Sequence, residues 1–404
     1  MRIALVSQWF SDGMGYAENL LPKALAKQGH EVYLFTSTAQ VYYNSPKYKD
    51  IYEPFIGPNI VALGESNVDG FTLCRLPLYK PNVLKGTGPG LIGLMEYLKK
   101  IKPDIIQVFE IGHVETYTAA LYCKNSSCIL FSESHTHASV VRKNNQRSLY
   151  ELFWHTVNLF NFRIKLINKQ SALCYAIAKD VKEMAISLYH FPEKKIKVQS
   201  LGVDCEIFKP DYSQIGIEER TNLRKQFNVE ENDILCIYTG RFTKDKDPHC
   251  LASAIDTLHH RGQKNYKAIF LGKGSREDVN YLKSKRGCTV LPFVLMKELP
   301  KYYRASDIGV WPREESTSQI DAFACGLPII ISNKVSVLER IDGNGLLYEE
   351  GNSIDLAEKI ASLNKAIRAE MSLVGIQKAQ EKYSWDRLAK ERILDYQKKL
   401  HQDE

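Results

Sequence analysis

Two basic side chains lie close enough in the sequence to bind one diphosphate group. Arg241 and Lys246 follow an apolar run and Gly240, and they precede Pro248, a residue that favours the first turn of a helix. Arginine offers a planar fork of N–H donors and lysine a mobile point charge, so the two can share a diphosphate. A solvated basic loop is the alternative, but the position between a strand and a helix favours a ligand.

A second segment carries groups that bind sugars and phosphates. It has carboxylates at both ends and hydroxyls between them: Glu314, Glu315, Ser316, Thr317, Ser318 and Asp321. Carboxylate oxygens accept hydrogen bonds from sugar hydroxyls. The open N–H groups at the start of the helix expected here can donate hydrogen bonds to a phosphate. An acidic helix cap worth ~1 kcal/mol would explain one of these residues, but not the set.

A glycine-containing loop precedes the first expected helix. Gly13 and Gly15 stand between that helix and the first expected strand, and glycine lets backbone amides approach a phosphate closely. The dinucleotide-binding fingerprint needs a third glycine, where this chain has Glu18 in a longer loop. A nicotinamide cofactor is therefore disfavoured, and a plain glycine turn is the alternative to phosphate binding.

Ionisable side chains alternate along a short segment that contains Glu133, His135 and His137. Alternate residues of an extended chain project to the same side, so these three side chains can share one site. A metal site is conceivable, but no fourth ligand is evident. We expect one histidine, His135 rather than His137, to contact a sugar or a diphosphate. A hydrogen-bonded loop histidine is the alternative.

The elements that must position these residues follow a regular alternation. Short apolar runs alternate with amphipathic helical stretches, which predicts α/β domains with parallel sheets. Strands are expected at residues 2–7, 31–36, 104–109, 128–132, 234–238, 268–271, 308–311 and 328–332. We expect one domain over residues 1–205, a second over 206–383, and an amphipathic helix over 384–404. Trp385 and Tyr396 of that helix need an apolar partner surface.

The composition limits the class of protein. The 404 residues, 44% hydrophobic and 25% charged, suit a soluble two-domain protein. The nine cysteines form no paired framework, which favours free thiols in a reducing, cytoplasmic compartment. No signal-peptide pattern or membrane-span-length apolar run of ~18 residues is evident, so no spanning helix is expected. The net charge of +7 suits phosphorylated substrates or anionic lipid, and no nucleic-acid motif stands out.

One stretch allows contact with a membrane. Residues 142–170 interleave basic and large apolar side chains, among them Phe153, Trp154 and Phe160. Such a stretch can lie at a bilayer interface and offer the site to a lipid-linked acceptor. A core helix with a solvated basic face is the alternative, and the pattern favours it slightly.

The motifs together resemble glycosyltransferase family 4, a group of retaining, metal-independent transferases with the GT-B fold. Each piece is weak alone, but their order and spacing along nearly the whole chain are specific. The matching pieces are Gly13-Met-Gly15, Gly29-His-Glu-Val32, Lys102-Pro-Asp104, Gly202-Val-Asp204 with Phe208, Gly240-Arg241 with Lys246, and Asp321-Ala-Phe-Ala-Cys-Gly-Leu-Pro328.

The resemblance implies two Rossmann-like domains facing each other across a cleft, with the last helix returning to the first domain. It implies a UDP- or GDP-linked sugar donor, no cofactor, no metal, and a glycan or lipid-linked acceptor in cell-envelope or surface polysaccharide synthesis. The implied catalytic residues are His135, Arg241, Lys246 and Glu314. The implied donor-binding residues are Gly13, Gly15, Gly240, Phe293, Val294, Glu315, Ser316, Thr317, Ser318 and Asp321.

The chain departs from the family at the carboxylates. The family usually has two glutamates separated by seven residues around a glycine-rich stretch, whereas Glu314 and Asp321 enclose six, with hydroxyl residues in place of glycines. Glu314 is preferred slightly over Glu315 as the carboxylate that holds the donor sugar. Two alternatives stay open: a nucleotide-sugar epimerase of GT-B fold and a catalytically degenerate nucleotide-sugar-binding subunit.

Overall fold

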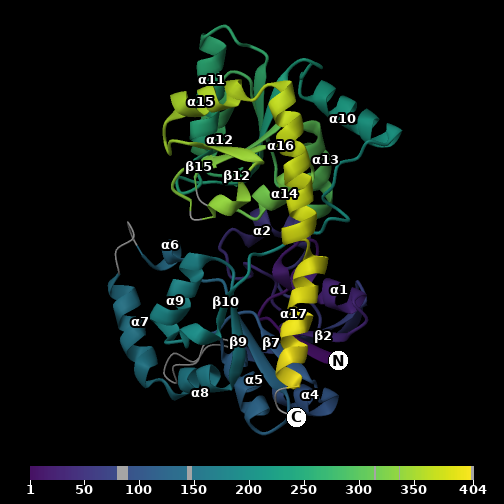
Figure 1. Ribbon diagram of the computed structural model, residues 1–404, viewed down its shortest axis with the longest axis vertical. Coiled ribbons are helices and arrows are strands. Elements are labelled where there is room, and N and C mark those ends of the chain that lie inside the picture. Colours follow the sequence, from purple (N-terminus) through teal and green to yellow (C-terminus); the bar gives the residue numbers. More distant parts are fainter. Residues whose placement is uncertain (80–89, 143–147, 314, 336, 402–404) are drawn as a thin grey trace. The chain divides into compact units, whose positions relative to one another are not determined.

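The computed structural model describes residues 1–79, 90–142, 148–313, 315–335 and 337–401. The chain forms two compact units (Figure 1). The first consists of Met1–Leu201 together with Leu388–Glu404, and the second of Gly202–Arg387. The boundaries expected from the sequence, after residues 205 and 383, lie a few residues from these. Residues 80–89 lie outside the described residues.

The first unit is built on an eight-stranded sheet in the order β10-β9-β8-β7-β1-β2-β4-β3. All neighbours are parallel except β3 and β4. The strands are β1 (Arg2–Val6), β2 (Glu31–Ser37), β3 (Gly64–Val68), β4 (Phe71–Leu76), β7 (Ile105–Val108), β8 (Ile129–Ser134), β9 (Ser171–Ala176) and β10 (Ile196–Val198), with a separate ribbon of β5 (Leu78–Tyr79) and β6 (Gly90–Leu91). The central strands are buried on both faces, which explains their continuous apolar sequences. The four strands predicted here are confirmed, with small shifts at their ends.

The helices of the first unit include one from the end of the chain. They are α1 (Ala17–Lys27), α2 (Tyr48–Ile51), α3 (Glu53–Ile56), α4 (Leu94–Ile101), α5 (Val114–Lys124), α6 (Ala138–Val141), α7 (Leu149–Phe160), α8 (Phe162–Gln170), α9 (Lys179–Tyr189) and α17 (Trp385–Leu400). From Leu388 onward, α17 belongs to the first unit. Its Tyr396 is fully buried with its ring 4.6 Å from that of Phe131 on β8, which provides the apolar partner that the sequence demanded.

The second unit has a six-stranded, wholly parallel sheet in the order β13-β12-β11-β14-β15-β16. Its strands are β11 (Ile234–Phe242), β12 (Tyr266–Gly274), β13 (Cys288–Leu291), β14 (Ile308–Trp311), β15 (Ile329–Ser332) and β16 (Gly345–Tyr348). Its helices are α10 (Gln214–Gln226), α11 (Pro248–His260), α12 (Arg276–Ser284), α13 (Leu299–Ala305), α14 (Ser318–Ala324), α15 (Ser353–Ser362) and α16 (Lys365–Lys378). The prediction of α/β units with parallel sheets is confirmed in both halves of the chain.

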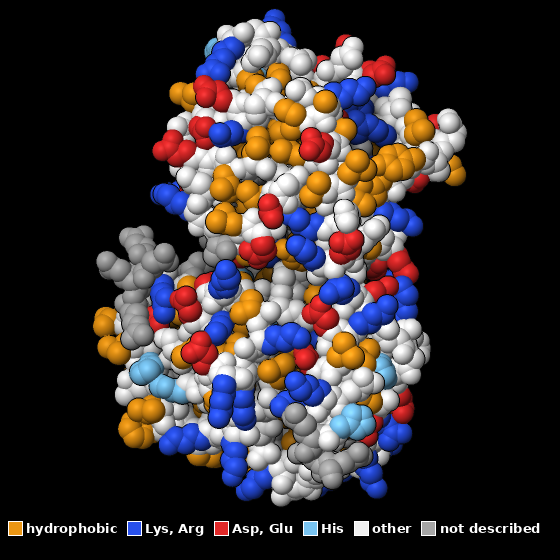
Figure 2. Space-filling view, in the orientation of Figure 1, with side chains coloured by type: hydrophobic (Ala, Val, Ile, Leu, Met, Phe, Trp, Pro, Cys, Tyr) orange, Lys and Arg blue, Asp and Glu red, His pale blue; other side chains and the backbone are white. Residues whose placement is uncertain are grey.

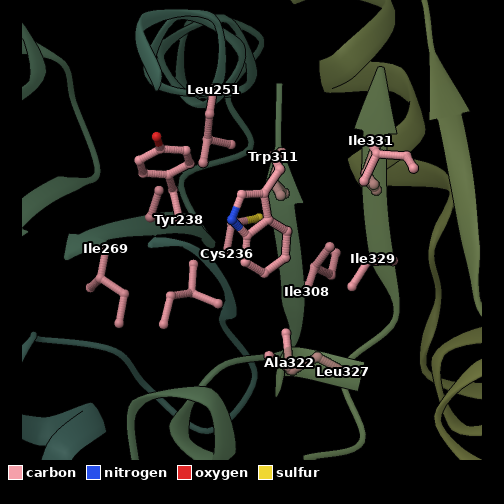
Figure 3. Close-up of a cluster of buried hydrophobic side chains, with 14 of the residues drawn as sticks. Cys236, Tyr238, Leu251, Ile269, Ile308, Trp311, Ala322, Leu327, Ile329 and Ile331 are labelled. Atoms are coloured by element: carbon pink, nitrogen blue, oxygen red, sulfur yellow. The ribbon is translucent and has the colours of Figure 1, made fainter. Parts of the chain in front are cut away.

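The core of the second unit fixes the ends of two strands (Figure 3). Trp311, the last residue of β14, lies among Cys236, Tyr238 and Leu251 and is buried to 1% exposure. Its indole Nε1 donates a hydrogen bond to the carbonyl oxygen of Thr239 on β11, at 3.1 Å. The strands β11 and β14 are therefore held together near their carboxyl ends, where the two polar segments found in the sequence begin.

Candidate functional site

The first polar segment begins inside the sheet. The sequence placed Gly240 and Arg241 after the strand, but β11 continues through Phe242 and pairs with β12 along its whole length. The pairing requires glycine at position 272, because a Cβ there would lie 1.8 Å from the carbonyl oxygen of the facing Gly240. This close approach also places Lys273 of β12 opposite Arg241.

The two basic residues predicted to bind a diphosphate differ in their surroundings. The Arg241 side chain is 69% exposed and lies 3.7 Å from the Asp245 carboxylate. Its carbonyl oxygen accepts a hydrogen bond from the Tyr238 hydroxyl at 2.7 Å, which fixes the backbone at this point. Lys246 Nζ donates to the carbonyl oxygen of Glu315 at 3.0 Å. The basic segment and the acidic segment therefore meet at the carboxyl edge of one sheet.

A buried arginine holds the acidic segment in place. Arg340 is 5% exposed, and its Nη1 donates to the carbonyl oxygen of Ser316 and to the Oε1 atom of Gln319, both at 3.1 Å. Thr317 follows as the N-cap of α14, and Ser318 is the first residue of that helix. Glu314, the preferred sugar-side carboxylate, lies outside the described residues, whereas Glu315 lies within them.

The carboxyl group of Asp321 has a strongly raised pKa. It lies in the first turn of α14. Burial, together with repulsion from Asp204, raises the pKa of Asp321 to about 8. Strongly shifted pKa values cluster at functional sites. The predicted base-bracketing residues Phe293 and Val294 follow β13, the strand next to β12, and are half-buried at the same edge of the sheet.

The glycine loop of the first unit has the backbone that it requires. Gly13 and Gly15 have φ values of 75° and 70°, in the left-handed region that favours glycine. The Asn19 side chain ties this loop to α1, because its Nδ2 donates to the carbonyl oxygen of Ser11 and its Oδ1 accepts the N–H of Tyr16, both at 3.0 Å. The loop therefore follows the carboxyl end of β1 in a fixed conformation.

His135 is surrounded by carboxylates. Its Nε2 lies 3.1 Å from Oε1 of the fully buried Glu133, and its backbone N–H donates to Oε2 of Glu110 at 3.2 Å. Burial disfavours the imidazolium, but Glu133, Glu110 and Glu18 outweigh burial and raise the pKa of His135. Burial also raises the pKa of Glu110 and of Glu18. A protonated imidazole in such a cluster can donate a hydrogen bond to an anion or to a sugar oxygen.

His137 belongs to a different set of contacts. Its Nδ1 lies 3.0 Å from Oδ2 of Asp180, and the same oxygen accepts the N–H of Ala138. The structure thus brings Glu133 and His135 together but not His137. Within the described ranges, no three or more His, Cys, Asp or Glu side chains are grouped as a metal site.

Four residues of these sites were missed by the sequence analysis: Glu110, Lys273, Arg340 and Arg392. Glu110 directly follows one expected strand, and Lys273 lies between two glycines just after a second. A pattern in the sequence could therefore have indicated both residues. Arg340 and Arg392 offered none, because their partners are distant in the sequence.

Two family models match the chain in sequence order. The model described as Glycosyltransferase Family 4 matches residues 17–207, and the model described as Glycosyl transferases group 1 matches residues 233–365. Among curated proteins, an uncharacterized glycosyltransferase of Methanocaldococcus jannaschii is 28% identical over 239 residues, which are 56% of this chain and 60% of that protein. The matches span about 60% of the length of the first curated relatives.

Solved structures extend the likeness to the whole chain. A glycosyltransferase from Rickettsia africae superposes with a TM-score of 0.70 at 16% identity, covering 100% of this chain and 99% of that one. Anabaena HepE in complex with UDP superposes with a TM-score of 0.67 at 16% identity, covering 99% and 100%. The GT-B architecture of two Rossmann-like units is therefore confirmed. Glycosyltransferase family models therefore match parts of both halves of the chain, and solved glycosyltransferases share its GT-B fold over nearly its full length.

Proposed function

We propose that this protein transfers a sugar from a UDP- or GDP-linked donor to a hydroxyl group of a glycan or lipid-linked acceptor, with retention of the anomeric configuration. The observation that carries the proposal is the contact between Lys246 Nζ and the carbonyl oxygen of Glu315. It joins a basic segment suited to a diphosphate to a carboxylate and hydroxyl segment suited to a sugar and a ribose. HepE, which shares the fold, was solved with UDP, and this supports a uridine donor as the first candidate.

The proposed chemistry depends on stabilising the leaving group. The bond between the anomeric carbon and the donor phosphate oxygen breaks, and negative charge grows on the nucleoside diphosphate. The acceptor oxygen bonds to that carbon on the same face, and its proton passes to the departing phosphate oxygen. Arg241 and Lys246 would offset the growing charge in place of a metal ion, because preorganised donors stabilise a transition state strongly. Asp321 would hold the ribose hydroxyls and Glu314 or Glu315 the donor sugar, while His135 would contact the transferred sugar.

A thermal-shift panel of UDP, GDP, ADP and their sugar conjugates tests the donor site. We expect one nucleotide to raise the melting temperature by about 5 °C at a hundredfold excess over its Kd, because a ligand that binds only the folded state stabilises it. Lys246→Ala should abolish the shift. The matched control Lys264→Ala removes a charge from an exposed turn before β12, at the opposite edge of the sheet, and should keep it.

The outcomes separate the candidate functions. Slow hydrolysis of the stabilising donor would support a transferase, whereas its epimerisation without an acceptor would support an epimerase. Binding without turnover on any acceptor would support a degenerate subunit. If no nucleotide shifts the protein at millimolar concentration, the proposed donor site is wrong.

The peripheral membrane contact proposed for residues 142–170 rests on the orientation of α7. The side of α7 that contacts the protein is polar: Glu151 binds Arg142 at 2.8 Å, His155 binds the carbonyl oxygen of Ser187 at 2.7 Å, and Asn158 donates to that of Leu188 at 2.9 Å. Its exposed side chains are apolar except for Thr156. The alternative of a core helix with a solvated basic face fits α8, whose Ile164 and Ile167 are buried, but it is wrong for α7.

The apolar surface of α7 is extensive. We define it as the exposed side chains Leu149, Tyr150, Leu152, Phe153, Leu159 and Phe160, which are 46–86% exposed. Hydrophobic side chains gather over α7 on the left of the view in Figure 2. Exposed Lys165 and Lys169 follow on α8, and the one acidic residue between positions 142 and 170, Glu151, is buried. Apolar side chains beside basic ones suit the interface of an anionic bilayer. No helix in the described part of the chain is long and apolar enough to span one.

Vesicle flotation tests this contact. The wild type should float with vesicles containing anionic lipid, and Phe153→Ser/Phe160→Ser should remain in the soluble fraction, because burying exposed aromatic surface drives interfacial binding. The matched control Ile215→Ser/Ile217→Ser changes two apolar side chains on α10 that are 78% and 51% exposed. This control should float like the wild type. Equal flotation of both variants, or a wild type that does not float, would contradict the membrane contact.

A further inference from the structure

The last helix of the chain places a buried arginine against Glu133, the carboxylate that contacts the candidate catalytic histidine. Arg392 of α17 is 0% exposed, and its Nη1 lies 2.5 Å from Oε2 of Glu133. Its Nε donates to Oε1 of Gln199 at 2.8 Å, and its guanidinium lies 4.4 Å from the centre of the Tyr175 ring. The guanidinium is thus fixed by contacts from several directions.

Glu133 divides its two oxygens between this arginine and the histidine. Oε2 binds Arg392 and also accepts a hydrogen bond from Gln107 Nε2 at 2.8 Å. Oε1 lies 3.1 Å from Nε2 of His135. Tyr396, one helical turn after Arg392, donates its hydroxyl hydrogen to Oε1 of Gln107. Two residues of α17 therefore determine how the carboxylate that faces His135 is oriented.

The position of this ion pair does not follow from stability alone. A buried ion pair costs desolvation energy, and apolar residues of similar volume often stabilise a fold equally well or better. Phe131 packs against Tyr396 beside the pair, and Gln107 and Gln199 hydrogen-bond to it. A pair kept at this cost, in direct contact with an ionisable side chain at the carboxyl end of β8, points to a role in setting the state of that side chain.

We propose that Arg392 and Glu133 are positioning residues for His135: Arg392 fixes Glu133, and Glu133 holds the imidazole in one orientation. The inference rests on the proposed transfer reaction, in which His135 contacts the transferred sugar. The charged and titratable groups around His135 are Glu133 from β8, Glu110 after β7, Glu18 from α1, and His113 before α5. Of these, Glu133 is the one in direct contact with the imidazole ring.

The decisive variant removes both charges of the pair. Glu133→Gln/Arg392→Met leaves no buried unpaired charge, so its melting temperature should stay near that of the wild type. Without the carboxylate, burial dominates, and the imidazole should lose its proton at a pH lower by about one unit or more. We expect kcat to fall about 100-fold, with little change in KM for the donor, because a misoriented group affects the transition state most. A purely structural pair predicts wild-type kcat in this variant.

Two readouts report the imidazole itself. NMR titration of the histidine rings, with His135→Gln to identify the signal, should show the lower pKa in the double variant. In the profile of kcat against pH, the part that depends on protonated His135 should move to lower pH by the same amount. Wild-type kcat together with an unchanged titration would overturn the proposal.

A second variant tests the proposal if the double variant misfolds. Arg392→Lys keeps the positive charge but loses the planar fork that reaches Glu133 and Gln199 together. It should remain folded, and kcat should fall about tenfold or more. Unchanged kcat in Arg392→Lys would overturn the positioning role of the fork. If the wild type transfers no sugar, the proposed function fails, but the NMR titration still tests the coupling of Glu133 to His135.

Discussion

Lys246→Ala should lower kcat about 100- to 1,000-fold while the protein stays folded, because removing one preorganised donor from a transition-state charge typically costs this much. Arg241→Ala should have a similar effect. Its side chain is 69% exposed, so its removal should change the free energy of unfolding by no more than about 0.5 kcal/mol. Lys246 donates to the carbonyl oxygen of Glu315, so its variant should also loosen the acidic segment.

The measurement is steady-state turnover of the donor identified by thermal shift, with melting temperatures for each variant. Lys244→Ala is the matched control, because it removes an exposed positive charge from the same loop. A loss that came only from the local positive potential would be equally large in Lys244→Ala. Near-normal turnover in both Lys246→Ala and Arg241→Ala would exclude diphosphate stabilisation by these residues.

The alternation of strands and helices was predictable because it is a local property of the sequence. Buried parallel strands need continuous apolar runs, and the runs at 234–238 and 308–311 indeed form β11 and β14. The extension of β11 to Phe242 was not predictable from those runs. It depends on Gly272 of β12 lying opposite Gly240 of β11. The residues that face each other across two strands are decided by the tertiary structure and not by local sequence.

The candidate sites were predictable where a motif follows a strand. His135, Arg241 and Asp321 each lie at or just beyond the carboxyl end of a strand or in the helix that follows, and local pattern was sufficient to select them. The partners that set their chemistry are distant in sequence. Arg392 is 259 positions from Glu133, and no local rule connects the two.

The orientation of α7 shows a second limit of local pattern. The interleaved aromatic and basic residues indicated an amphipathic stretch but not which side faces the protein. That side is decided by polar contacts to the end of α9, such as His155 to Ser187 and Asn158 to Leu188. A sequence pattern ranks the sides of a helix by hydropathy, and here the packed side is the polar one.

Asp321→Asn should stabilise the free protein and abolish nucleotide binding. The pKa of Asp321 is raised to about 8 by burial and by Asp204, whereas its unfolded value is near 3.8. Between about pH 4 and 8 the folded state keeps a proton that the unfolded state has lost, so stability falls as pH rises through this window. Asparagine carries no charge and removes this penalty.

The gain should therefore depend on pH. The gain in free energy of unfolding should be close to zero at pH 4 and about 2–4 kcal/mol at pH 8. This is less than the full pKa shift implies at ~1.4 kcal/mol per unit, because the side chain is only half-buried. Chemical unfolding of the wild type and of Asp321→Asn at several pH values measures it. Asp204→Asn is the matched control, because an amide oxygen can still accept the N–H of Glu206, as the carboxylate of Asp204 does at 2.9 Å. It should give a smaller gain and keep nucleotide binding.

A carboxylate that lowers stability at neutral pH needs a reason to be present. Asp321 lies near a second carboxylate, Asp204, and the described residues place no cation against it. If it binds the ribose of the donor, hydroxyl donors satisfy the carboxylate in the complex, and the ligand lowers its pKa again. Nucleotide binding should then release a proton at neutral pH, which calorimetry in buffers of different ionisation enthalpy detects. Retained binding in Asp321→Asn, or binding without proton release, would show that this carboxylate does not hold the ribose.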